Sequence, residues 1–556
     1  MDKFSFLNSA HTSFFAEMYD QYLESPDSLE PSWKAFFQGF DFGLENANIT
    51  VEEKKFEVPE NISKEFKVVN LIDAYRQRGH LFTITNPVRQ RRKYSPTLDI
   101  ENFGLTKTDL DLVFSAGEVV GIGPDKLSNI IDHLQKIYCE SIGLEYMYIR
   151  DPEKVKWIQN FININGNQPN FSKDEKLSIL DSLNKAYTFE NFLQKKYVGQ
   201  KRFSLEGGES LIPAIDFLIN SAAEKGIEEF VMGMSHRGRL NTLVNIFGKS
   251  SRDIFGEFEG KDYEEDIFDG DVKYHLGWTS ERTSTSGKKI NMNLAPNPSH
   301  LESVDPIVQG IARAKLENDF DNNTNKVLPI IVHGDAAIAG QGVVYEVIQM
   351  SRLKGYSTGG TIHLIVNNQV GFTTNYLDAR SSTYCSDVGK VTLSPVLHVN
   401  SDDVEAVIHA VTFALEYRNK FNRDVFIDLL GYRKYGHNEG DEPRFTQPKL
   451  YKYISGHPNP RDIYASKLKN QGIINDDHVS KIELEYFSKL EAELTDSKKK
   501  QKTKITPFMQ EVWEGFTRVD ENKMLEDYKT SSFKKDIFNI AKSITTLPNK
   551  LAVDIS

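Results

Sequence analysis

The sequence predicts an α/β protein in which a parallel sheet is flanked by helices and is preceded by a small helical domain and an N-terminal arm. From about Phe189 onward, short runs rich in β-branched residues alternate with amphipathic segments. Before this point the pattern is helical, and the first residues are dense in aromatic side chains. Regular alternation of strands and helices is typical of βαβ units and a parallel sheet. The predicted parts are the N-terminal arm (1–45), a linker (46–65), the small helical domain (66–188), the α/β domain (189–495), and a charged linker with the start of a further region (496–556).

The N-terminal arm has one apolar face. Five of its residues fall at helical spacing, namely Phe14, Phe15, Met18, Tyr19 and Tyr22. Such a face suits either a helix that packs on its own protein or a docking helix for another protein. On this stretch alone, packing on its own protein is the favoured interpretation. The polar residues 46–65, with Pro59, indicate a linker.

The small helical domain and the α/β domain differ in their hydrophobic pattern. From Val68 to about Ile149 the pattern is helical, and "LIDAYRQRGH" is its clearest segment. In the α/β domain the expected strands are "EEFVMGMSH", "VLPIIVHGD", "TIHLIVNNQ" and "DVFIDLLGY". The expected helices are "RGRLNTLVNIFG", "GVVYEVIQMSRLKG" and "VEAVIHAVTFALEYRNK". Residues 460–500 are expected to be helical, and 496–504 form a solvated charge run.

Composition excludes several classes of protein. A net charge of -12 argues against nucleic-acid binding, which needs a cationic surface. Two cysteines, Cys139 and Cys385, are too few for a disulfide framework or a zinc site. No apolar run approaches the ~20 residues that span a bilayer, so no membrane role is expected. The N-terminus has neither the basic start of a signal peptide nor the arginines of a transit peptide, and a bacterial cytoplasmic protein is the expectation.

The strongest chemical signal lies at the ends of two predicted strands. One strand ends in Gly334-Asp335 and the next in Asn367-Asn368, with one amphipathic helix expected between them. The spacing is about that of a single βαβ unit, so both ends should emerge at the same edge of a parallel sheet. Open α/β sheets bind their ligands at that edge.

The residue types at these ends suit magnesium and a diphosphate. Mg²⁺ takes oxygen ligands, commonly one or two carboxylates together with phosphate oxygens. Asp335 offers a carboxylate, Asn368 an amide oxygen and Val370 a backbone carbonyl. The small Ala336 and Ala337 begin the following helix, whose N-terminal N–H groups favour an anion. Alone, each piece is ordinarily a turn or a loop. Together they match the thiamine-diphosphate signature, which runs from Gly-Asp-Gly to Asn-Asn, except that Ala336 replaces the last glycine.

Four histidines form a second signal. His236, His275, His300 and His437 each lie in or beside a turn marked by glycine or proline. A lone histidine is usually structural, and these four are not spaced as metal ligands. They suit an anionic substrate and proton transfer near neutral pH. Arg237 adds a guanidinium group that matches a carboxylate.

These motifs closely resemble the decarboxylating component of 2-oxoglutarate dehydrogenases, over nearly the whole chain. The matching segments include "KRFSLEGGESLIP", "GMSHRGRLN", "DVKYHLG", "APNPSHLE", "HGDAAIAGQGVVYE", "NNQVGFTT" and "YRKYGHNEGDEP". The resemblance implies the thiamine-diphosphate-binding fold. It also implies the following residue roles: magnesium ligands Asp335, Asn368 and Val370; cofactor contacts Ser299, His300, Leu301, Asp335, Ala336, Ala337 and Asn368; substrate contacts His236, Arg237 and His275; and catalytic His236, His275 and His437.

The resemblance also implies an activity and an assembly. The activity is thiamine-diphosphate-dependent oxidative decarboxylation of 2-oxoglutarate, with succinyl transfer to a lipoyl group, in the tricarboxylic acid cycle. The implied partners are dihydrolipoamide succinyltransferase and dihydrolipoamide dehydrogenase, and the full-length family forms homodimers. The family's N-terminal segment docks onto the acyltransferase core, which reverses the packing interpretation of residues 1–45.

A further expectation concerns the region after the α/β domain. In the family, an additional domain supplies the glutamate that activates the cofactor, and this chain stops at Ser556, where that domain is expected to begin. The chain is therefore expected to be a fragment or to be completed by a second polypeptide, and to be inactive alone. Two alternatives remain: a carboligase or simple decarboxylase with the same cofactor, and a non-catalytic docking subunit.

Overall fold

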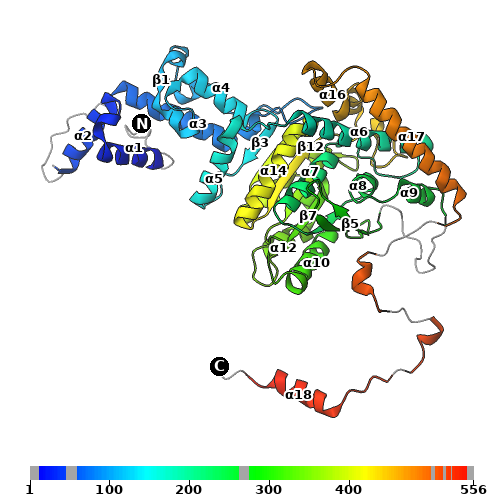
Figure 1. Ribbon diagram of the computed structural model, residues 1–556. Helices are drawn as coiled ribbons and strands as arrows, with labels where there is room; N and C mark the ends of the chain where they lie inside the picture. Colours follow the sequence, from blue (N-terminus) through cyan, green and yellow to red (C-terminus); the bar gives the residue numbers. More distant parts are fainter. Residues whose placement is uncertain are drawn as a thin grey trace. The chain divides into compact units, whose positions relative to one another are not determined.

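The computed structural model describes residues 12–45, 59–261, 275–502, 508–516, 521–527 and 529–547 (Figure 1). It divides into two compact units, Met1–Met509 and Gln510–Ser556. The larger unit holds every strand of the described residues: β1 (Val113–Phe114), β2 (Asp125–Lys126), β3 (Ile142–Glu145), β4 (Glu229–Met234), β5 (Trp278–Thr283), β6 (Lys289–Leu294), β7 (Val327–Gly334), β8 (Ile362–Asn367), β9 (Val370–Gly371), β10 (Thr374–Asn375), β11 (Val396–Asn400) and β12 (Val425–Leu430).

Eight of these strands form one sheet in the order β3-β11-β12-β8-β7-β4-β6-β5. The six central strands run parallel. The two edge strands, β3 and β5, run antiparallel to their neighbours. The mainly parallel α/β sheet that the sequence predicts is therefore confirmed. The antiparallel edges and the β5–β6 pair were not foreseen.

Many helices of the larger unit flank this sheet, whereas α1 (Thr12–Glu24) and α2 (Pro31–Glu45) lie away from it (Figure 1). The others are α3 (Glu60–Arg78), α4 (Leu127–Tyr138), α5 (Pro152–Asn163), α6 (Lys173–Lys196), α7 (Leu211–Glu224), α8 (Arg239–Asn245), α9 (Ser251–Phe258), α10 (Val304–Asp319), α11 (Asp335–Gly340), α12 (Gly342–Met350), α13 (Tyr376–Ala379), α14 (Val404–Phe421), α15 (Pro448–Ile454), α16 (Pro460–Asn470) and α17 (His478–Lys499). Between β7 and β8 lie two short helices, α11 and α12, where the sequence predicted one.

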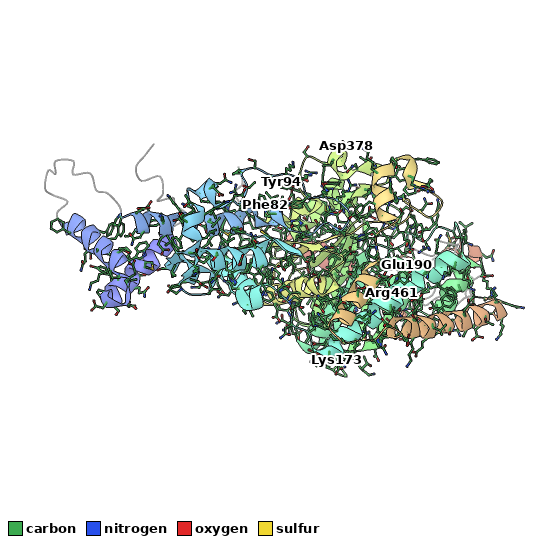
Figure 2. The ribbon with its side chains drawn as sticks, turned by 90° about the horizontal axis from the view of Figure 1, so that it is seen from above. Phe82, Tyr94, Lys173, Glu190, Asp378 and Arg461 are labelled. Atoms are coloured by element: carbon green, nitrogen blue, oxygen red, sulfur yellow. The ribbon has the colours of Figure 1, made fainter. Side chains whose placement is uncertain are left out.

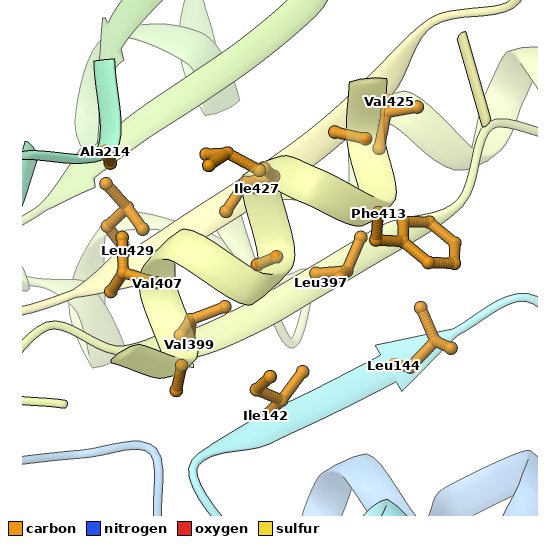
Figure 3. Packing of buried hydrophobic residues seen from close by; sticks show 14 of the residues in the cluster. Ile142, Leu144, Ala214, Leu397, Val399, Val407, Phe413, Val425, Ile427 and Leu429 are labelled. Atoms are coloured by element: carbon orange, nitrogen blue, oxygen red, sulfur yellow. The ribbon is translucent and has the colours of Figure 1, made fainter. Parts of the chain in front are cut away.

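Both faces of the sheet are buried, as expected for parallel strands. Successive side chains of a strand point to opposite faces. In β12, Ile427 packs in the cluster that includes Val407 of α14, whereas Phe426 packs on the other side with Ile348 of α12. Figure 3 shows the first of these layers, in which α14 lies over β11 and β12. The apolar alternation in sequence thus becomes two hydrophobic layers that hold the strand ends in place.

The N-terminal helices pack against the rest of the larger unit. Trp33 of α2 is fully buried, and its ring lies 5.7 Å from that of Phe66 in α3. Phe37 is also fully buried and stacks on Trp33. The side chains of residues 1–17 lie outside the described residues. The aromatic character of α2 is therefore explained, at least in part, by packing on this chain itself.

Three predicted boundaries differ from the structure. The linker was predicted to reach residue 65, but α3 already begins at Glu60, and residues 46–58 lie outside the described part. The boundary at 188/189 falls inside α6, and the boundary at 495/496 falls inside α17. The small helical domain also has no core of its own, because β3 pairs with β11 and Leu144 packs with Val399 in one cluster. Local periodicity did not reveal this long-range pairing.

The smaller unit, Gln510–Ser556, contains the helix α18 (Lys534–Thr545) and two short 3₁₀ turns in its described part. All of the described side chains of α18 are exposed. Within the described residues of the whole chain, no helix is long and apolar enough to cross a bilayer.

Candidate active site

Four neighbouring strands of the sheet end at one cavity. These are β4, β7, β8 and β12, and the cavity has a volume of about 620 Å³. Most of its walls come from residues at or just after the strand ends: Ser235 to Arg237, Gly334 to Ala337, Asn368, Val370 to Phe372, and Arg433 with His437. Leu301, Asp378 and Arg380 are among its other lining residues. The cavity thus lies at the carboxyl edge of the sheet, where open α/β sheets bind ligands.

Asp335 is the buried carboxylate of this cavity, which the exposed Asp378 also lines. It follows β7 directly and is only 3% exposed. The pKa of its carboxyl group is raised to about 6, mainly by burial and also by the negative charge of Asp428, while Arg380 and Arg237 oppose the shift. A buried carboxylate is unfavourable without a compensating charge. A cation bound at Asp335 would supply that charge.

The loop after β8 presents alternate residues to the cavity. Asn368 and Val370 line the cavity, whereas Asn367 and Gln369 do not line it and are hydrogen-bonded to other parts of the chain. The Asn367 amide donates to Asp428 at 2.8 Å. Gln369 has a left-handed backbone with φ of 67° and exchanges two hydrogen bonds with Asn86, at 2.8 and 3.1 Å. The two candidate metal ligands are therefore displayed by a loop whose other residues are anchored.

The cavity fits a diphosphate with its metal ion. A Cβ atom built on Gly334 would meet no atom within 4 Å, so the strand end opens onto free space. Ala336 and Ala337 add only methyl groups to the wall. Arg237 and Arg433 provide positive charge. The Val370 carbonyl accepts a long 3.5 Å hydrogen bond from Arg433, which leaves its second lone pair for a metal.

Two of the predicted histidines, His236 and His437, contact each other edge to face, with ring centroids 5.9 Å apart, and both contact one phenylalanine ring. The Phe203 ring lies 3.8 Å from the His236 ring and 5.6 Å from the His437 ring. The pKa of His236 is lowered to about 3, by burial and then by Arg237 and His437. The pKa of His437 is lowered to about 4, by burial and then by Arg237 and Arg433. Both rings are therefore neutral at pH 7, and the positive charge of the cavity resides on its arginines.

Arg237 joins the segments that carry these rings. Its guanidinium donates to the backbone carbonyls of Ser204 at 3.0 Å and His437 at 2.9 Å. The Glu439 carboxylate adds a second link, because it accepts from the backbone N–H groups of residues 202–204 at 2.7, 3.2 and 2.8 Å. The sequence suggested Arg237 as a partner for a substrate carboxylate and carried no signal for Glu439. In the structure both fix the geometry of the histidine pair.

Three predicted site residues do not line this cavity. They are His275, Ser299 and His300. The Ser299 hydroxyl and the His275 ring are in hydrogen-bond contact at 3.2 Å, so these two form a pair. The His300 carbonyl accepts a hydrogen bond from Ser303 at 2.8 Å. The other nine predicted site residues all line the cavity, and they derive from sequence positions between 236 and 437.

A buried ionic network beneath the cavity was not foreseen. The His398 ring lies between two carboxylates, with Asp428 at 2.9 Å and Glu145 at 3.0 Å. Burial alone would lower the pKa of His398, but hydrogen bonds to Asp428 and Glu145 overcome this and raise it to about 9. Because Asp428 also holds Asn367, the network supports the loop of Asn368. The only signal in the sequence was a polar residue inside each of three apolar strands.

Comparison with known proteins gives two family matches. The family described as "Dehydrogenase E1 component" matches residues 182–506. The family described as "2-oxoglutarate dehydrogenase N-terminus" matches residues 4–44. The first match includes every residue that lines the cavity, and the second falls on the N-terminal arm.

Curated relatives carry one common name, "2-oxoglutarate dehydrogenase E1 component". The relative from Azotobacter vinelandii is 42% identical over 512 residues, covering 87% of this chain and 54% of the relative. The relative from Haemophilus influenzae is 41% identical over 510 residues, with 87% and 54% covered. The relative from Rickettsia conorii is 38% identical over 569 residues, with 99% and 60% covered. The chain therefore spans between about half and three-fifths of the length of these relatives.

Proposed function

Because this chain belongs to the dehydrogenase E1 component family, we propose that it carries the diphosphate- and magnesium-binding part of the decarboxylating component of a 2-oxoglutarate dehydrogenase complex. The proposed reaction is the oxidative decarboxylation of 2-oxoglutarate, with transfer of the succinyl group to a lipoyl group. The observation that carries the proposal is the convergence of Asp335, Asn368 and Val370 on one cavity at the ends of adjacent parallel strands.

The proposed cofactor is thiamine diphosphate with Mg²⁺. When bound, the thiazolium ring supplies the electron sink for decarboxylation, which the side chains of a protein lack. In this proposal Asp335, Asn368 and the Val370 carbonyl hold the metal. Ala336 and Ala337 leave room for the diphosphate, and Leu301 packs against the cofactor. The side chains of the loop after β8 need little reorganisation, because their neighbours are already anchored.

The proposed roles of the histidines follow from their neutral state. His236 and His437 offer one donor and one acceptor each at pH 7, so they suit hydrogen bonding and proton transfer to the substrate. Arg237 and Arg433 supply the positive charge that a dicarboxylate substrate requires. His275 is proposed to act with Ser299 from outside the described cavity wall.

The proposed assembly follows the names of the relatives and the match of the N-terminal arm. Residues 1–45 dock onto the dihydrolipoamide succinyltransferase core, the third member is dihydrolipoamide dehydrogenase, and the decarboxylating component is a homodimer. The packing of Trp33 and Phe37 on α3 is compatible with docking, since Leu23 of α1 and Phe40 and Phe42 of α2 stay exposed by 59%, 38% and 68%.

The decisive test is cofactor binding by this chain. Isothermal titration calorimetry should show thiamine diphosphate binding that requires Mg²⁺ and that Asp335→Ala abolishes. A matched control is Asp402→Ala, which removes a buried carboxylate near the sheet but outside the cavity wall. Equal affinity with and without Mg²⁺, or equal losses in the two variants, would contradict the proposal.

Turnover is tested separately by ferricyanide reduction with 2-oxoglutarate. The assay compares this chain alone with the chain supplemented by the unmatched part of the Azotobacter vinelandii relative. We expect turnover only in the supplemented sample, because the resemblance places the cofactor-activating glutamate in that part. Transfer of a succinyl group to lipoamide separates this function from a simple decarboxylase or a carboligase.

A further inference from the structure

Three arginine side chains converge on one tyrosine beside the cofactor cavity. The guanidinium carbon lies 4.8 Å from the Tyr376 ring centroid for Arg92, 5.2 Å for Arg89 and 5.5 Å for Arg380. Arg89 and Arg92 belong to the segment between α3 and β1, whereas Tyr376 and Arg380 belong to α13 and its C-terminal end. Figure 2 labels Phe82 and Tyr94 on the first segment and Asp378 on α13.

The positive charge of this cluster is offset only in part, by the electrostatic interaction of Arg380 with Asp335. Within the described residues, Arg89, Arg92 and Arg380 form no ion pair with a carboxylate at 4 Å or less. Burial lowers the pKa of Arg89, and Tyr376 is the one group that acts in the opposite direction. Like charges brought together on a ring lose part of the stacking energy to mutual repulsion. Such an arrangement is stabilised when an anion joins it.

Several hydrogen-bond donors of the cluster are buried and unused. Nε and Nη2 of Arg89 and Nε of Arg380 are shielded from solvent and make no hydrogen bond within the described residues. Arg89 uses only Nη1, in a long 3.4 Å contact with Asn375. Buried donors are nearly always satisfied in native proteins, so these donors are available to an added acceptor.

A small hollow lies next to these groups. It has a volume of about 80 Å³, and its walls include Arg92, Arg380 and Tyr376 together with the hydroxyl-bearing Thr383 and Tyr94. Arg89 does not line this hollow but approaches it through the same Tyr376 ring. This volume holds a few non-hydrogen atoms and not a nucleotide. A carboxylate is planar and engages one guanidinium fork at a time, whereas a tetrahedral phosphate presents oxygens in several directions. The size and the donors therefore favour a single phosphate group.

We propose that Arg89, Arg92 and Arg380, gathered on Tyr376, form a second anion site that binds a phosphate group beside the cofactor cavity. The site adjoins the proposed diphosphate position, since Arg380 lines both hollows, whereas Arg89, Arg92 and Tyr376 do not line the larger cavity. It bridges two segments that also hold the loop of Asn368, because Asn86 contacts Gln369 and Arg89 contacts Asn375. A phosphate bound there joins the helical region to the cofactor loop.

The test is calorimetric titration of the chain with inorganic phosphate, in chloride buffer of matched ionic strength and without thiamine diphosphate. It is therefore independent of the proposed enzymatic function. We expect saturable binding, which Arg92→Gln weakens by about tenfold or more, as for loss of a charge-assisted hydrogen bond. Arg92 is exposed, so this variant should keep its fold, and a thermal melt checks this. Tyr376→Ala should weaken binding as well.

The matched control is Lys93→Gln, which removes the same charge from the neighbouring exposed position and lies outside the cluster. Unchanged affinity in Lys93→Gln supports the site. Equal losses in Lys93→Gln and Arg92→Gln, or no saturable binding to the parent chain, would overturn it. A parallel titration with ribose 5-phosphate identifies the source of the phosphate. If ribose 5-phosphate binds more tightly than inorganic phosphate, the ligand of the site is a phosphate ester; if it binds more weakly, the ligand is the free phosphate ion.

Discussion

Asn86→Ala removes the side chain that holds Gln369 in place behind the candidate metal loop. The two amides exchange hydrogen bonds at 2.8 and 3.1 Å. Gln369 has a φ of 67°, a left-handed conformation that costs about 1–2 kcal/mol for a residue with a Cβ atom. A neutral hydrogen bond contributes about 0.5–1.5 kcal/mol net, so the pair offsets a cost of that size. In the variant, the Gln369 side chain keeps only its hydrogen bond to the Gly431 carbonyl at 2.8 Å, while its backbone N–H still donates to Asn367 at 3.0 Å.

The expected result is weaker binding of Mg²⁺ and thiamine diphosphate. If the loop must be reordered at a cost of about 1.4 kcal/mol, affinity falls by about tenfold. Calorimetry measures this on the purified variant. Asn86→Gln should not restore affinity, because its longer side chain displaces the amide from Gln369, whereas a Gln369→Asn change in the Asn86→Gln background should restore part of it.

A matched control separates positioning from general stability. Asn167→Ala also removes a buried amide with two hydrogen bonds, to Ile137 at 3.0 Å and His409 at 3.1 Å, far in sequence from the cofactor loop. Asn167→Ala should lower the melting temperature but leave cofactor affinity intact. The reasoning is refuted if Asn86→Ala binds the cofactor as tightly as the parent chain, or if Asn167→Ala weakens binding equally.

Three further predictions concern the charged groups and the N-terminal arm. Asp335→Asn should abolish Mg²⁺-dependent binding yet stabilise the metal-free protein at pH 7 by up to about 3 kcal/mol. The reason is that a carboxyl pKa raised to about 6 makes the parent lose stability as pH rises toward and through 6. Urea unfolding of parent and variant at pH 5 and 7 checks this, and an equal difference in stability at both pH values would contradict it. His398→Gln should lower the melting temperature at pH 7. It should also remove the loss of stability that the parent shows as pH rises through about 9, since a raised histidine pKa stabilises the fold only below that value. A parent melting temperature that stays constant between pH 8 and 10 would count against this. Removal of residues 1–45 should abolish co-sedimentation with the succinyltransferase core while binding of thiamine diphosphate persists, and co-sedimentation of the shortened chain would exclude the docking role.

The sequence predicts the strand ends of the site well, because its signals there are local. Gly334-Asp335 and Asn367-Asn368 each end an apolar run, and the spacing between them specifies a βαβ unit. The same holds for His236 and His437, which follow β4 and β12. Apart from Asn367, each of these residues reaches the cavity because parallel strands present their carboxyl ends at one edge.

Other features were out of reach because they depend on contacts between distant segments. Asn86, Glu145 and Glu439 act on residues more than 200 positions away, and no local pattern marks them. The edge strand β3 has four buried residues and no alternation, so its periodicity does not distinguish it from its helical surroundings. The predicted boundary at 188/189 falls inside α6, whose buried residues run from Ile179 to Leu193 and so continue across it.

The pairing of β3 with β11 has a consequence for how the chain is made. Ile142 aligns with Val399 and Leu144 with Leu397. The edge strand β3 can therefore pair only after a segment about 250 residues later in the chain has been synthesised. A ribosome that adds about 5–20 residues per second needs on the order of ten to fifty seconds to reach it. During that interval the buried faces of Ile142 and Leu144 lack their sheet neighbour. The nascent N-terminal region is therefore expected to rely on chaperones at this stage, and its acquisition of protease resistance on stalled ribosomes should come only after β11 and β12 have emerged.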